Sequence, residues 1–177
     1  MFHPNTLRFL EWWRGLPQVG GVPARASVEP AALARVLPQV FILAEDLSFR
    51  LAGGLVCDLH GRELRDRAFA PLWDRPDQGR LAAALERAVV GREPVIVQAD
   101  AHPLTGAGVG LQITMAPLAS RAGGAADRLI GLYQPTSMLA RLRGRPVQTL
   151  SIRRVHPEPA ANDARLRLVA VDGRRIA

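Results

Sequence analysis

The 177-residue sequence contains no lysine, only one cysteine and few aromatic residues. The single cysteine, Cys57, cannot form a disulfide within the chain, so nothing in the sequence indicates an oxidising compartment. The sequence also lacks an apolar run of the roughly 18 residues or more that a membrane-spanning helix needs. Its first ten residues have neither the basic start nor the long apolar centre of a secretory signal. We therefore expect a cytoplasmic protein without a membrane span.

Because lysine is absent, all 23 basic residues are arginine, and the formal net charge is +7. Arginine pairs well with phosphate and carboxylate groups, so a nucleic acid or another anionic partner is one interpretation. The other is base composition, because abundant Ala, Arg, Gly and Pro without Lys is typical of a GC-rich genome. Basic charge alone is a weak indicator of nucleic-acid binding. We favour the second interpretation and expect no nucleic-acid partner.

Hydrophobic periodicity predicts one mixed α+β chain without internal repeats. We expect helices over residues 6–16, 30–37 and 77–90, with short helical segments over 55–59 and 62–72. Asp77 is the expected N-cap of the long helix, and Gly91 its left-handed C-terminal residue. Strands are expected over residues 40–43, 48–52, 94–100, 108–117 and 128–134, the last three as an antiparallel meander.

The chain divides into three parts. Residues 1–26 form an N-terminal helix and a loop, residues 27–135 the main domain, and residues 136–177 an Arg-rich extension. Segments 147–155 and 165–171 of that extension have the pattern of a further strand pair. Its Arg clusters at 141–145 and 153–154 have the chemistry to hold phosphate groups, such as those of a cyclic dinucleotide. We favour a solvated face or a partner-binding edge.

Several short motifs, in their order and spacing, resemble one known family. They are "WWRGL", "VPARASVEP", "LPQVFIL", "FRLAGG", "GREL", "MAPL" and "LIGLYQP". Together they are similar to the bacterial PAS-like family best known from alphaproteobacteria, with one departure at Gly54, where that family often has Thr. The resemblance implies a PAS-like fold: a five-stranded antiparallel sheet with small helices on one face, an N-terminal helix and a C-terminal extension.

The resemblance also bears on cofactors. Flavin-binding PAS light sensors place a reactive Cys in a turn that corresponds here to residues 61–64, where Leu64 takes the Cys position. Haem-binding members place a His on or near the long helix, but residues 77–90 contain none, and His102 follows the next strand. We therefore expect no cofactor and disfavour both flavin and haem.

Neither catalysis nor metal binding is indicated. Cys57 and His60 are three residues apart, but a closed zinc site needs two further ligands, and the other His residues have no matching spacing. No Ser-His-Asp or Cys-His order stands out. The glycine-rich stretch at 106–110 lies between two strands rather than before a helix, which argues against a phosphate loop. We expect no metal and no enzyme activity.

The resemblance to PAS domains suggests where a ligand or a partner would bind. Side chains between the sheet and the small helices would line either a solid core or a small-molecule pocket: Phe41, Leu43, Phe49, Leu51, Leu55, Leu59, Leu85, Ile113, Met115 and Leu132. Arg25 and Arg50 are expected in a structural or anion-contacting role. The apolar side of the leading helix is an expected interface: Phe9, Leu10, Trp12, Trp13 and Leu16.

These observations predict a stand-alone PAS-like sensory or regulatory module. Its output would pass through a homodimer, a signalling-protein partner or both, with a small-molecule ligand in the PAS pocket as a further option. The alternative is an Arg-rich protein that binds nucleic acid or an anionic nucleotide.

Overall fold

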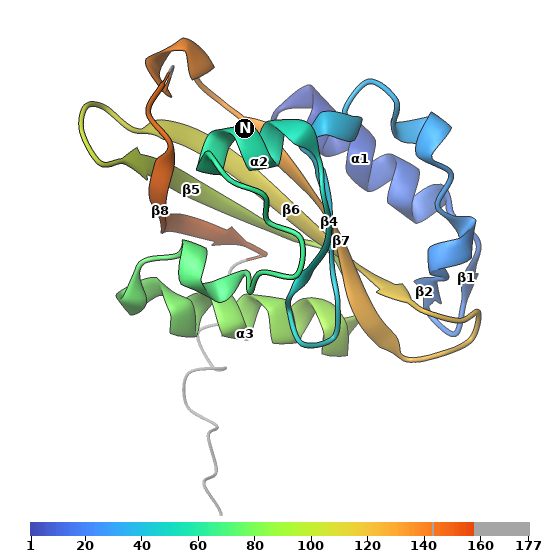
Figure 1. Cartoon of the computed structure of the whole chain (residues 1–177). Coiled ribbons are helices and arrows are strands. Elements are labelled where there is room, and N and C mark those ends of the chain that lie inside the picture. Colours follow the sequence, from blue (N-terminus) through green and yellow to red (C-terminus); the bar gives the residue numbers. More distant parts are fainter. Residues whose placement is uncertain (143, 158–177) are drawn as a thin grey trace, which may run out of the picture.

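The computed structural model describes residues 1–142 and 144–157 (Figure 1). Its elements follow one another as α1 (Pro4–Gly15), β1 (Gln18–Val19), β2 (Val22–Pro23), η1 (Arg25–Ser27), η2 (Pro30–Leu33), η3 (Leu37–Gln39), β3 (Val40–Leu43), β4 (Phe49–Ala52), α2 (Gly54–His60), η4 (Ala70–Leu72), α3 (Arg75–Gly91), β5 (Val95–Pro103), β6 (Val109–Ala119), β7 (Ala126–Pro135), η5 (Leu139–Leu142) and β8 (Val147–His156), where η marks a 3-10 helix.

The main sheet has six antiparallel strands in the order β4-β3-β7-β6-β5-β8. The sequence predicted five strands, because it assigned residues 147–155 to a separate pair in the extension. The strand over those residues does form, but it hydrogen-bonds to β5 and extends the sheet. Its expected partner, 165–171, lies outside the described residues, as does Arg143.

The two faces of the sheet are covered by different elements (Figure 1). Helices α2 and α3 and the segment around η4 lie on one face, where Phe41, Val97 and Ile113 belong to the larger apolar cluster. Helix α1 and the segment containing η2 lie on the opposite face, against Ile42 and Leu132. Strands β6 and β7 are therefore buried on both sides along most of their length.

The long helix begins three residues earlier, and ends one residue later, than the predicted cap residues indicate. Asp74, not Asp77, is the N-cap residue, and the helix includes Gly91. The left-handed residue that follows is Arg92, with φ of 55°. Asp77 lies in the first turn instead, where its carboxylate accepts a hydrogen bond from the backbone of β8.

Three connecting segments also differ from the prediction. The loop expected over residues 15–26 contains the β1–β2 hairpin and η1. The helix expected over residues 30–37 is split into η2 and η3, each with a proline in its first turn. Of the short helices expected over residues 62–72, only η4 forms. Proline can occupy a first turn because its missing N–H has no partner to lose there.

Candidate functional site

The larger apolar cluster contains a chain of aromatic rings between the sheet and the helices on its first face. His60 ends α2, Trp73 follows η4, and Tyr133 lies on β7. The His60 and Tyr133 ring centroids are 6.0 Å apart, edge to face. Tyr133 meets Phe41 at 5.4 Å, and Phe69 meets Trp73 at 5.7 Å. The rings of Phe41 and Phe69 are stacked at 5.7 Å and join the two ends of this chain.

Polar atoms in this interior lack hydrogen-bond partners among the described residues. They are the Tyr133 hydroxyl, Trp73 Nε1 and both ring nitrogens of His60. The side chains of all three residues are more than nine-tenths buried. The His60 ring lies near the backbone of Val147, but without the geometry of a normal hydrogen bond. Buried polar groups in proteins are nearly always paired, so this cluster calls for an additional partner.

The interior is electrically neutral at pH 7. Burial lowers the pKa of His60 to about 4; the nearby Val147 backbone opposes this shift, and the charge of Arg62 adds to it. Burial raises the pKa of Tyr133. His60 is therefore a neutral imidazole with one donor and one acceptor nitrogen, and Tyr133 is a phenol that both donates and accepts. Trp73 Nε1–H only donates.

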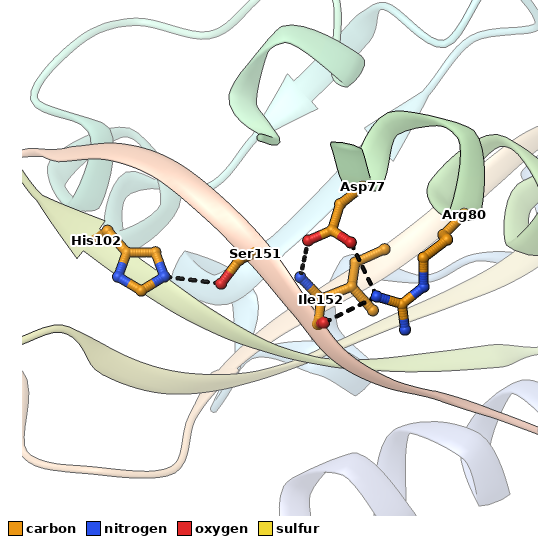
Figure 2. Close-up of polar contacts among 5 residues, drawn as sticks. All are labelled: Asp77, Arg80, His102, Ser151 and Ile152. Carbon is orange, nitrogen blue, oxygen red and sulfur yellow. Dashed lines mark hydrogen bonds and ion pairs between the residues drawn. The ribbon is translucent and has the colours of Figure 1, made fainter. Parts of the chain in front are cut away.

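Strand β8 closes this interior at one edge. Its Val147, Leu150 and Ile152 belong to the same apolar cluster as the rings. Figure 2 shows how α3 holds the strand: Ile152 N–H donates to Asp77 Oδ2 over 2.6 Å, and Arg80 Nη1 donates to Ile152 O over 3.1 Å. The segment that the sequence treated as an extension is thus part of the wall of the candidate site.

The structure also brings together a Ser–His pair that the sequence analysis missed. His102 Nε2 lies 2.7 Å from Ser151 Oγ, on neighbouring strands (Figure 2). The pair is exposed to solvent. Within the described part of the chain, no acidic group is hydrogen-bonded to the imidazole. Asp100, two residues away on the same strand, is ion-paired with Arg153 at 3.3 Å. The pair thus lacks the third group that orients a catalytic histidine.

Most of the predicted pocket residues lie on the face of the ring cluster. They are Phe41, Leu43, Phe49, Leu59, Leu85, Ile113 and Met115, with Leu55 half-buried against them. Two predictions were misplaced. The Leu51 side chain is 39% exposed, and Leu132 lies in the opposite cluster beneath α1.

The expected interface of the leading helix is largely internal. Phe9, Leu10 and Trp13 are buried, and Trp13 Nε1 donates to Pro117 O over 3.0 Å. These three side chains attach α1 to its own sheet. Trp12 and Leu16 are half-buried and remain accessible at the surface.

The two singled-out arginines lie apart from the ring cluster. Arg25 starts η1 and is half-buried, and its guanidinium has no hydrogen bond within residues 1–142 and 144–157. Arg50 is exposed and pairs with Asp66 over 3.9 Å. The role expected for Arg25 stays a prediction. Cys57 is buried near Glu63, which it meets at 3.8 Å (Sγ to Oε2), and no metal-binding group of three His, Cys, Asp or Glu residues occurs in the described part.

Sequence comparison identifies the family. Residues 1–134, most of the chain, match the family described as the PAS domain. The chain belongs to the PAS domain family. PAS domains are generally sensory or regulatory, typically not enzymes, and often bind ligands or dimerise. The narrower alphaproteobacterial type stays a prediction. Among curated proteins, no significant sequence match is found.

Similar solved structures are distant. The PAS domain of Bordetella pertussis BvgS is 14% identical, with a TM-score of 0.45 over 65% of this chain and 90% of the other. A Rhodobacter sphaeroides LOV protein is 10% identical, with a TM-score of 0.47 over 66% and 74%. An RNA-binding Light-Oxygen-Voltage receptor is 16% identical, with a TM-score of 0.48 over 67% and 36%.

Two of these relatives correct the cofactor prediction. The sequence led us to expect no cofactor and to disfavour flavin and haem. The disfavouring of flavin was wrong, because light-oxygen-voltage proteins, the flavin-binding light sensors of the PAS family, are among the similar structures. The disfavouring of haem stays a prediction. Leu64, which the sequence analysis placed at the position of the reactive Cys, is fully buried in the ring cluster.

The polar members of the site had a faint signal in the sequence. Tyr133 is the only tyrosine of the chain and lies in an apolar strand. Strand alternation from Leu129 places it on the same face as Phe41.

Within the described residues, no helix is long and apolar enough to cross a membrane.

Proposed function

We propose that this PAS domain is a sensory module that binds a small, uncharged, planar molecule between the sheet and helices α2 and α3. The observation that supports it best is the buried, unpaired Tyr133 hydroxyl, with Trp73 Nε1 and the His60 ring in the same cluster. An unpaired buried donor or acceptor costs about 1–3 kcal/mol, and a ligand that pairs with it recovers that free energy.

The chemistry of the interior defines the ligand class. Trp73 requires an acceptor, while Tyr133 and neutral His60 accept or donate. The aromatic rings around them favour a flat ring system over a branched chain. A charged ligand is disfavoured because the interior offers no counter-charge, and burying an unpaired charge is costly. A flavin ring and other neutral heterocycles meet these requirements, with Tyr133, Trp73 and His60 as the residues that would hold them.

The ligand signal would leave the interior through two routes. One is β8, because Val147 lies beside His60 and Leu150 forms an isolated β-bridge with Trp73. The other is β7, where Tyr133 on one face adjoins Leu132 on the other, in the cluster that anchors α1. A ligand that favours one arrangement of these elements would shift the population of states seen by a partner protein or by a second copy.

Native mass spectrometry and an absorption spectrum of gently purified protein test this proposal. We expect a non-covalent mass in addition to the chain, with an absorption band beyond the protein's own if the ligand is a flavin. Tyr133→Phe with Trp73→Phe keeps an aromatic ring at each position but removes the two hydrogen-bonding groups, and we expect at least about a tenfold loss of bound ligand.

Thr114→Val is the matched control. Thr114 is fully buried and its hydroxyl is also unpaired in the described part, but strand alternation places it on the opposite face, under α1. The control should therefore retain the ligand. A wild-type spectrum that shows only the mass of the chain would contradict the proposal. So would equal ligand occupancy in wild type and in the double variant.

A further inference from the structure

A groove of about 340 Å³ lies on the opposite side of the sheet from the ring cluster, between α1 and the segment of η2 and η3. Phe9 and Trp12 form one wall, and residues 31–36 form the other. Phe9 and Leu33 are buried members of the cluster under α1, so the bottom of the groove is apolar. Trp12 is half-buried, and its ring is partly open to solvent.

One arginine stands on each wall of this groove. Arg8 comes from α1 and Arg35 from the segment between η2 and η3, and both side chains are exposed. Neither guanidinium has an ion pair or hydrogen bond to any described residue. No carboxylate lines the groove. An apolar cleft flanked by two free positive charges is therefore exposed on the surface.

We infer that this groove docks a short acidic segment of a partner protein that carries one apolar anchor side chain. The apolar bottom and the half-open Trp12 ring would receive the anchor, as buried aromatic pockets do in peptide-recognition sites. Carboxylates on either side of the anchor would pair with Arg8 and Arg35, and guanidinium groups suit carboxylates because they bind them bidentately. This inference is independent of ligand binding in the interior.

Charge and shape argue against two other occupants. A second copy of this chain carries a net charge of +7, so its approach to two free arginines is opposed by like charge. A nucleic acid gains its affinity from a run of phosphate contacts, often about six to ten. The groove offers only two arginines beside an otherwise mostly apolar lining.

Fluorescence anisotropy of a labelled peptide tests this assignment on the full chain. The probe is a short peptide of alternating Glu and Ala with one central Phe; its counterparts replace Phe by Gly or every Glu by Lys. We expect the acidic Phe peptide to bind more tightly than either counterpart, with an affinity that falls as salt is raised. Binding should also protect Trp12 from quenching by acrylamide, while the buried Trp13 and Trp73 are protected throughout.

Variants distinguish the groove from general charge attraction. Arg8→Glu with Arg35→Glu should lower the affinity for the acidic peptide about tenfold or more. Ala32→Trp, at an exposed position of the wall, should block the groove without disturbing the core. Arg14→Glu with Arg121→Glu is the matched control, because it changes the net charge equally at exposed positions outside the groove.

Several outcomes would overturn the assignment. One is equal binding of the Lys peptide, and another is an equal loss of affinity in the control pair. A single-stranded RNA that displaces the peptide and loses affinity in the Arg8 and Arg35 variant would assign the groove to nucleic acid instead. A concentration-dependent dimer that Ala32→Trp abolishes would assign it to a second copy. Loss of the interior ligand in Tyr133→Phe should leave peptide binding in place, which separates this inference from the proposed function.

Discussion

Asp77 and Ile152 are separated by 75 residues in sequence, yet the Ile152 N–H donates to Asp77 Oδ2 over 2.6 Å. Arg80 completes the contact, because its Nη1 lies 2.9 Å from Asp77 Oδ1 and donates to Ile152 O (Figure 2). β8 is one of the two edge strands of the sheet. Its free edge would otherwise present unpaired backbone groups, which invite pairing with another strand. The first turns of α3 therefore cover part of that edge.

This contact predicts that β8 loosens when Asp77 is truncated. Asp77→Ala leaves the Ile152 N–H without its acceptor and Arg80 without its ion pair. We expect the free energy of unfolding to fall by about 1–3 kcal/mol. Hydrogen exchange should become faster than in wild type in β8, and change less in β6. Urea unfolding and hydrogen exchange with mass spectrometry measure the two effects.

Glu86→Ala provides the comparison for that experiment. Glu86 is exposed on the same helix and has no partner among the described residues, so its loss should change stability little. Unchanged exchange in β8 of Asp77→Ala would show that the strand is held by its apolar side chains and its pairing with β5 alone.

A second prediction concerns Gln112, which attaches the start of α1 to the sheet. Its Oε1 accepts from His3 N and from Thr6 Oγ1, each over 2.9 Å, and its Nε2 donates to Met1 O over 3.2 Å. Gln112→Leu leaves these groups unpaired. We expect a loss of about 1–3 kcal/mol and faster proteolysis of the first residues, followed by mass spectrometry.

The matched control is Gln98→Leu. Gln98 pairs with Gln112 in the register of β5 and β6, so both side chains lie on the same face of the sheet. No side-chain hydrogen bond of Gln98 occurs in the described part. If the two variants behave alike, α1 is attached by its apolar contacts and not by the Gln112 network.

Much of the sheet could be predicted because its strands follow simple alternation. Leu111, Ile113 and Met115 occupy one side of β6, and strand alternation finds them without further knowledge. The sixth strand was harder. Residues 147–155 have a strand pattern, but their partner β5 is about 50 residues away, and local sequence carries little information on such pairings.

The candidate site was only half predictable, and β7 shows why. On a strand with one solvated face, alternation separates apolar from polar residues. In β7 both faces are covered, so Leu132 and Tyr133 are equally buried and the pattern cannot distinguish their sides. Leu132 was expected among the pocket residues, whereas Tyr133 is the residue of this pair that lies in the ring cluster. Gly131 obscures the pattern further, because it presents no side chain on the face where Leu129 and Tyr133 lie.

A third prediction follows from that glycine. A Cβ atom at Gly131 would lie 2.7 Å from Thr114 O and would overlap the Phe41 ring. Gly131→Ala therefore has to displace an aromatic ring at the centre of the cluster, and overpacking of this kind typically destabilises by about 1–3 kcal/mol. Thermal unfolding measures the change.

Gly79→Ala is the opposite case on the same chain. Gly79 lies within α3, and a Cβ there meets nothing within 4 Å. Alanine in a helix interior is about 0.5–1 kcal/mol more favourable than glycine. We therefore expect Gly79→Ala to raise the melting temperature and Gly131→Ala to lower it. Two variants that shift it in the same direction would contradict the packing described for Phe41.

The fourth prediction concerns pH and His60. Burial lowers the pKa of His60 from 6.5 to about 4 in the folded state. Between these values the unfolded chain binds a proton that the folded chain does not, so the free energy of unfolding falls as pH falls. The contribution of neutral His60 to the free energy of unfolding is fully present above about pH 6.5 and is lost progressively as the pH falls toward 4.

The His60→Leu variant separates the contribution of His60 to this pH dependence from that of the carboxylates, which also titrate in acid. The two pKa values correspond to about 2 kcal/mol of stability lost at about pH 5. His60→Leu fills the same buried position without a titrating group, so its stability should fall less between about pH 7 and pH 5. If His60→Leu and wild type lose equal stability over this range, the imidazole titrates as it does in solvent. The ring cluster would then be open to water, and its polar groups would need no ligand to pair with.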